Sequence, residues 1–77
     1  MALYFFDVHD SRFILDDIGT ELADAAEVRA EVKRVLGELV QHPDFGGDTH
    51  RLRIDVRDAG GRRVLTGRLM MVIEDAS

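Results

Sequence analysis

Hydrophobic and polar positions follow two periods along this chain: alternation near both ends, and a spacing of three and four residues between them. Alternation is typical of strands that bury one face, whereas the three-and-four spacing is typical of an amphipathic helix. Short polar segments rich in Asp and Gly separate the periodic stretches. The pattern therefore predicts the order strand, strand, helix, strand, strand.

The first predicted strand, residues 3–9, is dense in aromatic and β-branched side chains. Alternation places three apolar residues on one face: Tyr4, Phe6 and Val8. The opposite face begins apolar and ends polar: Leu3, Phe5, Asp7 and His9. Two apolar faces predict a central strand, or a strand whose second face is covered by a partner.

Turn-forming residues divide the rest of the N-terminal part. Asp10-Ser11 separates the first strand from a second at residues 12–15, as in a hairpin. Residues 16–19 form another turn, in which Gly19 is able to adopt the left-handed conformation that other residues resist. Residues 20–22 then extend the hairpin briefly.

The helix is predicted between Asp24 and Pro43. Asp24 and Glu27 have the spacing of a capping box, and Pro43 blocks continuation of the helix. Between them lies one apolar stripe: Val28, Val32, Val35, Leu36 and Leu39. Gly37 costs about 1 kcal/mol relative to alanine in a helix interior. Close approach of another backbone is one reason for a glycine there.

The last part of the chain is predicted to be a β-hairpin with one dry and one wet face. Its dry face holds the apolar residues of one parity: Leu52, Ile54, Val56, Leu65, Leu69, Met71 and Ile73. A register with Arg57 opposite Arg62 gathers arginines on the wet face: Arg51, Arg53, Arg57, Arg62 and Arg68. The other residues of that face are mixed in character: Asp55, Val64, Thr66, Met70 and Val72. A bulge at Gly60 or Gly61 would change this register locally.

These elements predict one α+β domain over residues 1–77, a four-stranded antiparallel sheet in the order β-β-α-β-β with one amphipathic helix on one face. The other face is left to water or to a second subunit. Seventy-seven residues form only a small core, and with no cysteine there is no disulfide and no Cys-based zinc site. Oligomerisation is the remaining source of stability.

The net charge of −5 disfavours nucleic acid and anionic membranes as partners. Charge is unevenly placed, since residues 1–31 hold eight acids and two arginines, whereas residues 51–77 hold six arginines and four acids. This asymmetry suits self-complementary docking, although solvated surfaces also differ in this way. No apolar run approaches the roughly 18 residues of a membrane span, and the start lacks signal-peptide features. We expect a cytoplasmic protein.

Two groups of residues are candidates for binding. The arginines of the wet face suit phosphates or carboxylates, although Arg to Asp cross-strand pairs are a simpler role for them. The second group is a polar cluster of Asp7, His9 and Asp17 that suggests a hard-metal or His-carboxylate site. Turn-forming and solubilising aspartates are the simpler interpretation of that cluster. His42 and His50 flank the helix-to-strand loop and are best interpreted as surface histidines.

Catalysis has little support in the sequence. Neither serine lies in a nucleophile motif, and neither Gly-Gly pair has a phosphate-binding fingerprint. A chain this short also has difficulty enclosing a substrate pocket of several hundred Å³. We therefore predict no enzymatic activity, no catalytic residue, no metal and no cofactor.

Several short motifs occur together in a recognisable order: Tyr4-Phe5-Phe6-x-Val8-x-Asp10, Asp17-x-Gly19-Thr20-Glu21-Leu22, the helix led by Ala25 and Ala26, and Asp58-x-x-Gly61-Arg62. As a set they resemble a family of very short bacterial proteins, common in rhizobia and related alphaproteobacteria, that is known only as a domain of unknown function. The resemblance implies a free-standing cytoplasmic protein. It brings no activity, cofactor or catalytic residue with it.

Three functions follow from these observations. The leading hypothesis is a non-enzymatic protein-binding or self-associating module, in the first place a homodimer. The second is a regulatory anion or nucleic-acid binder that uses the arginine-rich face. The third is a metal or catalytic site around Asp7, His9 and Asp17.

Overall fold

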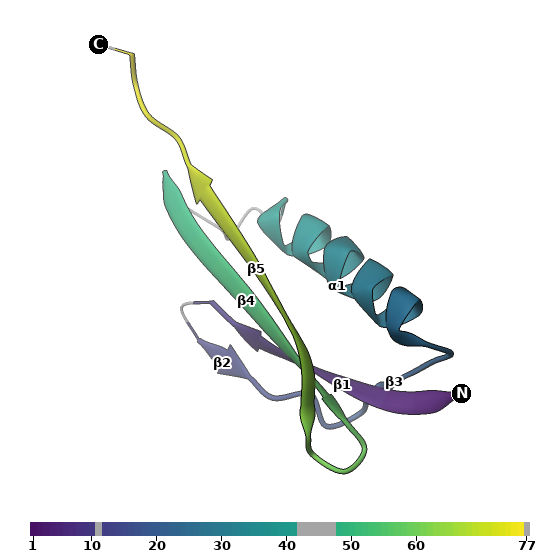
Figure 1. Cartoon of the computed structure of the whole chain (residues 1–77). Helices are drawn as coiled ribbons and strands as arrows, with labels where there is room; N and C mark the ends of the chain where they lie inside the picture. Colours follow the sequence, from purple (N-terminus) through teal and green to yellow (C-terminus); the bar gives the residue numbers. More distant parts are fainter. Residues whose placement is uncertain (11, 42–47, 77) are drawn as a thin grey trace.

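The structure, a computed structural model, describes residues 1–10, 12–41 and 48–76. It has six elements in chain order (Figure 1): β1 (Ala2–His9), β2 (Phe13–Ile14), β3 (Thr20–Leu22), α1 (Ala25–Val40), β4 (Thr49–Asp58) and β5 (Arg63–Val72). The predicted α+β class, with one helix and an antiparallel sheet, is confirmed. The predictions for Ser11, His42, Pro43 and the Gly46-Gly47 connection lie outside the described residues.

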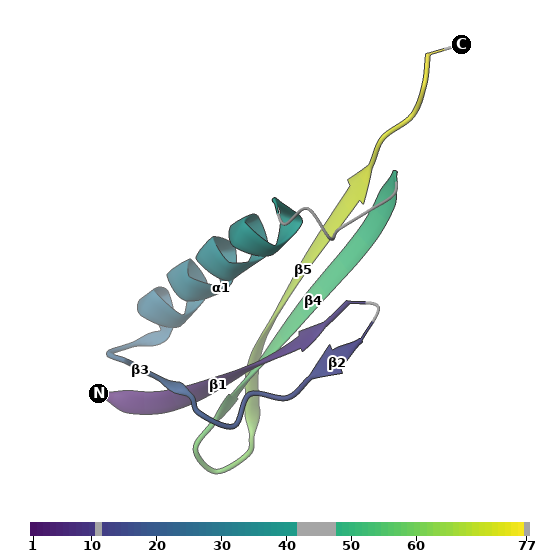
Figure 2. The ribbon, with the colours of Figure 1, turned by 180° about the vertical axis from the view of Figure 1, so that it is seen from behind.

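The strands are ordered β2-β1-β4-β5, and every pairing is antiparallel. β3 pairs with the first half of β1, on the edge that β2 occupies in the second half (Figure 2). Residues 20–22 thus add a short fifth strand to the four that were predicted. The prediction that β1 is a central strand is confirmed, because it pairs with β4 on its other side.

The second apolar face of β1 is covered by the protein's own chain. Gly19 lies over Leu3 and Phe5 with a φ of 82°, and a Cβ built on it would stand 3.0 Å from both side chains. The left-handed conformation predicted for Gly19 is confirmed, and the same position has no space for a side chain. The two apolar faces of β1 therefore need no partner molecule to cover them.

Helix α1 begins as the capping box predicts. The Asp24 carboxylate accepts a hydrogen bond from the Glu27 amide at 2.9 Å, and the Glu27 carboxylate accepts one from the Ala23 amide at 2.7 Å. The buried core joins three helix residues to three of β4: Val28, Val32, Leu36, Leu52, Ile54 and Val56. Half-buried residues surround it, among them Tyr4, Phe6, Val8, Val35, Leu39, Leu65 and Leu69. The predicted inner faces of helix and sheet are thus confirmed.

The close approach of the helix to the sheet occurs at a glycine of β5 and not at the helix glycine. A Cβ built on Gly67 would overlap Cγ1 of Val32 and lie 3.4 Å from Cδ1 of Leu36. A Cβ on Gly37 would meet no atom of the described residues within 4 Å. The explanation predicted for Gly37 was therefore wrong, because α1 rests against the sheet at Val32 and Leu36.

The register of the β4–β5 hairpin differs from the predicted one by two residues. Arg51 lies opposite Met70, and Arg53 lies opposite Arg68. The side chain of Asp58 sets the turn, since it accepts hydrogen bonds from the amides of Gly60 and Arg62 at 3.0 and 2.9 Å. A shift of two residues keeps the side chains away from the turn on their predicted faces, because the period of a strand is two.

A bulge at Val56/Arg57 shifts the residues at the turn end of this hairpin. Arg63 now pairs with Arg57, whereas Arg62 lies in the turn instead of on the arginine face. Val64 lines a small hollow with Tyr4, Ala25, Val28 and Leu65, so it lies on the helix side and not on the predicted outer face. Past the other end of β5, Ile73 is 55% exposed.

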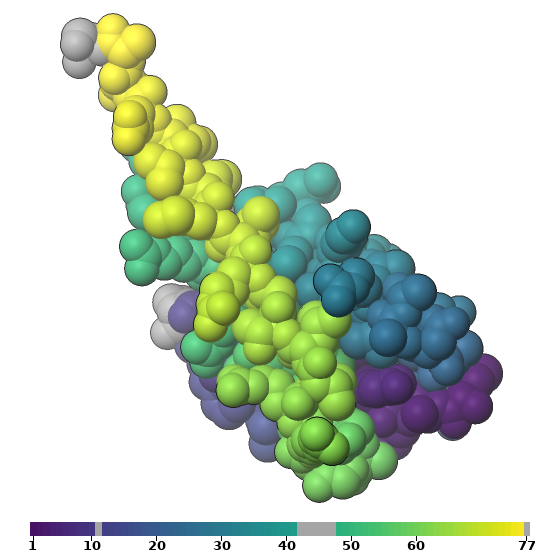
Figure 3. Space-filling view, viewed as in Figure 1, coloured from purple at the N-terminus to yellow at the C-terminus, as the bar shows by residue number. Residues whose placement is uncertain are grey.

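The β4–β5 hairpin makes the molecule elongated. Pairing between β1 and β4 stops at His9 and Arg53, so residues 49–52 of β4 extend beyond β1 and, among the described residues, pair with β5 alone. Figure 3 shows the C-terminal end of the chain projecting from the rest of the molecule. The radius of gyration is 13.9 Å, against about 11.5 Å for a compact domain of this length. The chain is therefore more extended than a compact domain of its length.

Candidate functional site

The outer face of the sheet, away from α1, carries the charged residues that were candidates for binding. Arg57 at its centre is held by other groups of the protein. Its Nε donates to Asp7 Oδ2 at 2.9 Å, its Nη2 donates to the Asp16 carbonyl at 2.6 Å, and its guanidinium lies 4.6 Å from the centre of the Phe5 ring. Asp7 is only 6% exposed, so this ion pair is largely removed from water. Arg57 thus has a structural role, because its guanidinium already contacts Asp7, Asp16 and Phe5.

Asp16 fills the gap between β2 and β3 along the edge of β1. Its Oδ2 accepts the Phe6 amide at 3.0 Å, and its Oδ1 accepts the amides of Ile18 and Gly19 at 3.0 and 3.1 Å. Burial raises the pKa of Asp16, but these hydrogen bonds and the charge of Arg57 bring it below the ordinary 3.8. On this edge no described strand pairs with β1 between Tyr4 and Val8, and the Asp16 carboxylate accepts the Phe6 amide there instead.

Asp55 is the centre of a second network. It accepts a hydrogen bond from Thr66 Oγ1 at 2.9 Å and lies 3.1 Å from His9 Nε2, while Arg53 and Arg63 approach it at 3.5 and 3.8 Å. Burial raises the pKa of Asp55, but the Thr66 hydrogen bond and the nearby positive charges bring it below its ordinary value. Arg53 Nη2 also lies 3.1 Å from His9 Nδ1. A neutral imidazole with its proton on Nε2 satisfies both contacts of His9.

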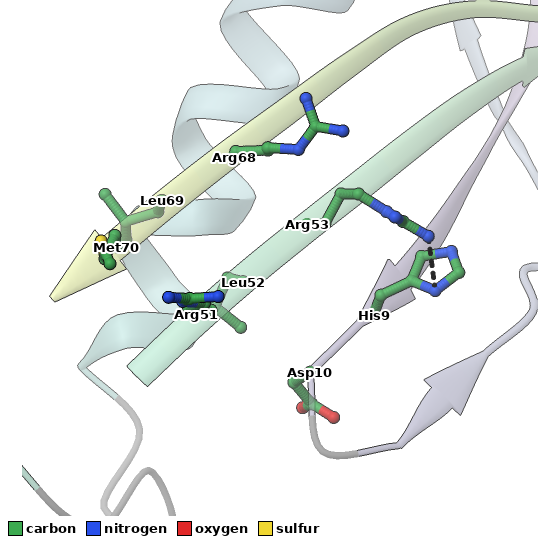
Figure 4. Close-up of a pocket in the computed structure, with 8 residues that line it drawn as sticks. All are labelled: His9, Asp10, Arg51, Leu52, Arg53, Arg68, Leu69 and Met70. Carbon is green, nitrogen blue, oxygen red and sulfur yellow. Dashed lines mark hydrogen bonds between the residues drawn. The ribbon is translucent and has the colours of Figure 1, made fainter. Parts of the chain in front are cut away.

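A groove of about 650 Å³ opens where β1 ends and the hairpin continues (Figure 4). It is lined by His9, Asp10, Arg51, Leu52, Arg53, Arg68, Leu69 and Met70, and we call it the arginine groove. Arg53 reaches across it from β4 to His9 on β1 (Figure 4). Arg51 and Arg68 have no hydrogen-bond or ion-pair partner within residues 1–10, 12–41 and 48–76. Their charges are therefore available to a ligand.

A family model described as a domain of unknown function, DUF6894, matches residues 3–70. The chain belongs to the DUF6894 family. The matched range contains every residue that lines the arginine groove, and it ends two residues before the end of β5. Neither the curated proteins nor the solved structures contain a match to this chain. Among the described residues of this DUF6894 domain, no helix has the length and apolar character needed to cross a membrane.

The five candidate arginines of this DUF6894 domain lie in different environments. Arg57 and Arg53 belong to the two networks, and Arg62 lies in the β4–β5 turn. Arg51 and Arg68 face the groove without partners in the described part of the chain. The polar cluster of Asp7, His9 and Asp17 is likewise divided. Asp7 binds Arg57, His9 contacts Asp55, and Asp17 is exposed in the turn after β2. In the described part of the chain, no group of three or more His, Asp or Glu residues is placed to hold a metal ion.

Sequence reasoning missed the role of Asp16, although the chain contains a signal for it. Asp16 precedes Gly19 by three residues, and Asp58 precedes Gly61 by three. Both glycines have positive φ, and both aspartates accept hydrogen bonds from amides of the turn that follows. The repeated Asp-x-x-Gly spacing therefore indicates two side-chain-capped turns.

The lowered pKa values of Asp16 and Asp55 predict acid unfolding of the DUF6894 domain. A carboxyl group with a lowered pKa in the folded state stabilises the protein fully above its unfolded pKa, near 3.8, and this stability is lost as the pH falls below that value. The free energy of unfolding measured in urea should therefore fall steeply below pH 3.8. Asp16→Asn should make this pH dependence shallower, whereas Asp17→Asn at the exposed neighbouring position should not. Equal pH dependence in wild type and Asp16→Asn would contradict the assignment.

Proposed function

We propose that this DUF6894 protein is a small non-enzymatic module of the cytoplasm that binds protein by self-association, forming a homodimer through the outer edge of β5. The main support for this proposal is that the outer edge of β5 is unpaired among the described residues. β5 is ten residues long and pairs only with β4 in the part of the chain that the structure describes. An exposed strand edge offers a row of backbone donors and acceptors to another strand.

Apolar side chains accompany this edge. Val64, Met70, Val72 and Ile73 are between 46% and 58% exposed, and all lie on β5 or directly after it. Figure 3 shows β5, in green to yellow, running uncovered along the visible face of the molecule. Natural proteins protect long strand edges with charge, proline or a covering segment. β5 has no proline, and its apolar residues favour a covering strand.

The opposite edge of the sheet is less suitable for pairing. It consists of the two-residue β2 and the three-residue β3, with the carboxylate of Asp16 accepting the Phe6 amide between them. Short interrupted strands offer few consecutive backbone groups to a partner. Pairing of β5 with β5 of a second copy is antiparallel and isologous. It therefore uses the β5 edges of both copies in one interface and stops at a dimer.

The small core supplies the energetic reason for association. Six hydrophobic residues are buried in the described part of the chain, and the hairpin extends beyond them. Domains of this size gain stability from disulfides, metals or oligomerisation. The chain has no cysteine, which leaves association as the support for an elongated hairpin.

The proposal of a non-enzymatic role draws on the pairing of charges on the outer face. Asp7 and Asp55 each contact arginine, and His9 contacts both Asp55 and Arg53. General acid–base catalysis requires a group that is free to exchange a proton with a substrate. Mutual neutralisation of these side chains favours structural roles for them.

Substitution of apolar residues on β5 by lysine tests the proposal. The double variant Val64→Lys/Val72→Lys should sediment at equilibrium with the monomer mass of 8.7 kDa at concentrations where the wild type is dimeric. Both positions are exposed, and lysine on an edge strand opposes pairing. Ile14→Lys/Ile18→Lys is the matched control, with the same change of charge on the opposite edge, and should sediment like the wild type. An unchanged mass for Val64→Lys/Val72→Lys would reject β5 as the interface.

A further inference from the structure

The arginine groove contains two like charges in direct opposition. Arg53 and Arg68 are paired residues of neighbouring strands, a position in which the Cβ atoms stand about 5 Å apart. Arg51 lies on the same face of β4, two residues before Arg53. Like charges placed directly opposite one another destabilise a sheet. Local features that oppose stability are concentrated at functional sites.

The acidic groups nearby compensate only one of these arginines. Arg53 lies near Asp55, which also contacts His9, Arg63 and Thr66. Of the described residues that line the groove, Asp10 is the one carboxylate, and it lies at the end of β1, across β4 from β5. Its Oδ1 accepts the amide of Arg12 at 2.6 Å. Among residues 1–10, 12–41 and 48–76, Arg51 and Arg68 are left as two uncompensated cations.

We infer that the arginine groove binds a phosphate monoester group. At neutral pH such a group carries a charge of about −1.5 to −2, which matches the two uncompensated guanidinium groups. Guanidinium forks bind phosphate oxygens in a bidentate manner. A phosphate placed between Arg51 and Arg68 would also relieve the repulsion between Arg68 and Arg53. This inference is independent of self-association through β5.

The shape of the groove agrees with a phosphorylated ligand of moderate size. Its volume of about 650 Å³ falls in the range of about 300–1,000 Å³ that is usual for small-molecule sites. Leu69 and Met70 add apolar surface beside the arginines, and Met70 is 58% exposed. The charged part of a ligand would meet Arg51 and Arg68, while its organic part would contact Met70.

Thermal unfolding with inorganic phosphate as the probe tests the inference. Phosphate should raise the Tm of the wild type saturably above its value in chloride at matched ionic strength, because a ligand of the folded state stabilises it. Arg51→Gln/Arg68→Gln should weaken phosphate binding at least about 10-fold, as expected for the loss of charge-assisted hydrogen bonds. The same variant should have a higher Tm than the wild type without phosphate, since it removes the opposed charges.

Arg12→Gln/Arg62→Gln is the matched control, with the same loss of charge at two exposed positions outside the groove. It should bind phosphate as the wild type does. Backbone amide shifts of residues 51–53 and 68–70 on titration with phosphate should locate the site. The inference is overturned if phosphate and chloride give the same Tm, or if Arg51→Gln/Arg68→Gln binds phosphate as tightly as the control.

Two sources of the phosphate monoester are distinguished by competition. Free O-phosphoserine and a phosphoserine-containing peptide should both displace inorganic phosphate from the groove. Tighter binding of the peptide would identify a phosphorylated protein as the source, and equal binding would identify a free phosphorylated molecule. Failure of both to displace phosphate would reject the site.

Discussion

Arg57→Ala will lower the free energy of unfolding by about 3 kcal/mol, as expected when one partner of a buried ion pair is removed. Arg57 holds the carboxylate of Asp7, which is 6% exposed, and donates to the carbonyl of Asp16. Alanine leaves a buried negative charge without its cation and frees the segment that covers Phe5. Urea unfolding followed by circular dichroism at pH 7 measures the change.

Arg63→Ala is the matched control, because Arg63 is mostly exposed and reaches Asp55 only at 3.8 Å. Pairs of this kind contribute about 0–1 kcal/mol. Asp7→Asn in the Arg57→Ala background should recover part of the loss, since it removes the unpaired charge and retains an oxygen for the Asp16 amide. A loss in Arg57→Ala no larger than in Arg63→Ala would contradict the structural role of the pair.

Gly67→Ala is the second substitution with a large expected effect. The added methyl group would overlap Val32 on the helix, so α1 must move away from β5 or Val32 must change its rotamer. Overpacking of this kind costs about 1–3 kcal/mol, and it should lower both the Tm and the free energy of unfolding.

Gly37→Ala is the control for the Gly67 prediction, and its expected effect has the opposite sign. A methyl group at Gly37 meets no described atom within 4 Å, and alanine is favoured over glycine in a helix by about 1 kcal/mol. Gly37→Ala should therefore raise stability while Gly67→Ala lowers it. Equal stability of the two variants would mean that α1 does not rest on β5 as described.

The element order and the buried faces could be predicted from the sequence because both depend on local period. The stripe that contains Val28, Val32 and Leu36 fixes which side of the helix is buried, and alternation fixes the faces of each strand. The register of the last hairpin could not be predicted in this way. It depends on the Asp58 side chain in the turn and on the bulge at Val56/Arg57, neither of which changes the alternation.

The candidate site was predictable only in part. Alternation placed most of the arginines on one face, but it gave no means of deciding which of them are neutralised. The groups that contact Arg53 and Arg57 include His9 and Asp7 on β1, 44 and 50 residues away along the chain. Contacts over such distances depend on strand order, and strand order is decided by packing of the whole sheet. The structure was therefore needed to show that Arg51 and Arg68 have no partner among the described residues and can contact a ligand.

The proposed function depends on self-association through β5. Light scattering during size-exclusion chromatography across a dilution series tests it most directly. We expect a mass of twice 8.7 kDa at high micromolar concentration, with a decline toward 8.7 kDa on dilution. A single species of 8.7 kDa at every concentration would contradict it.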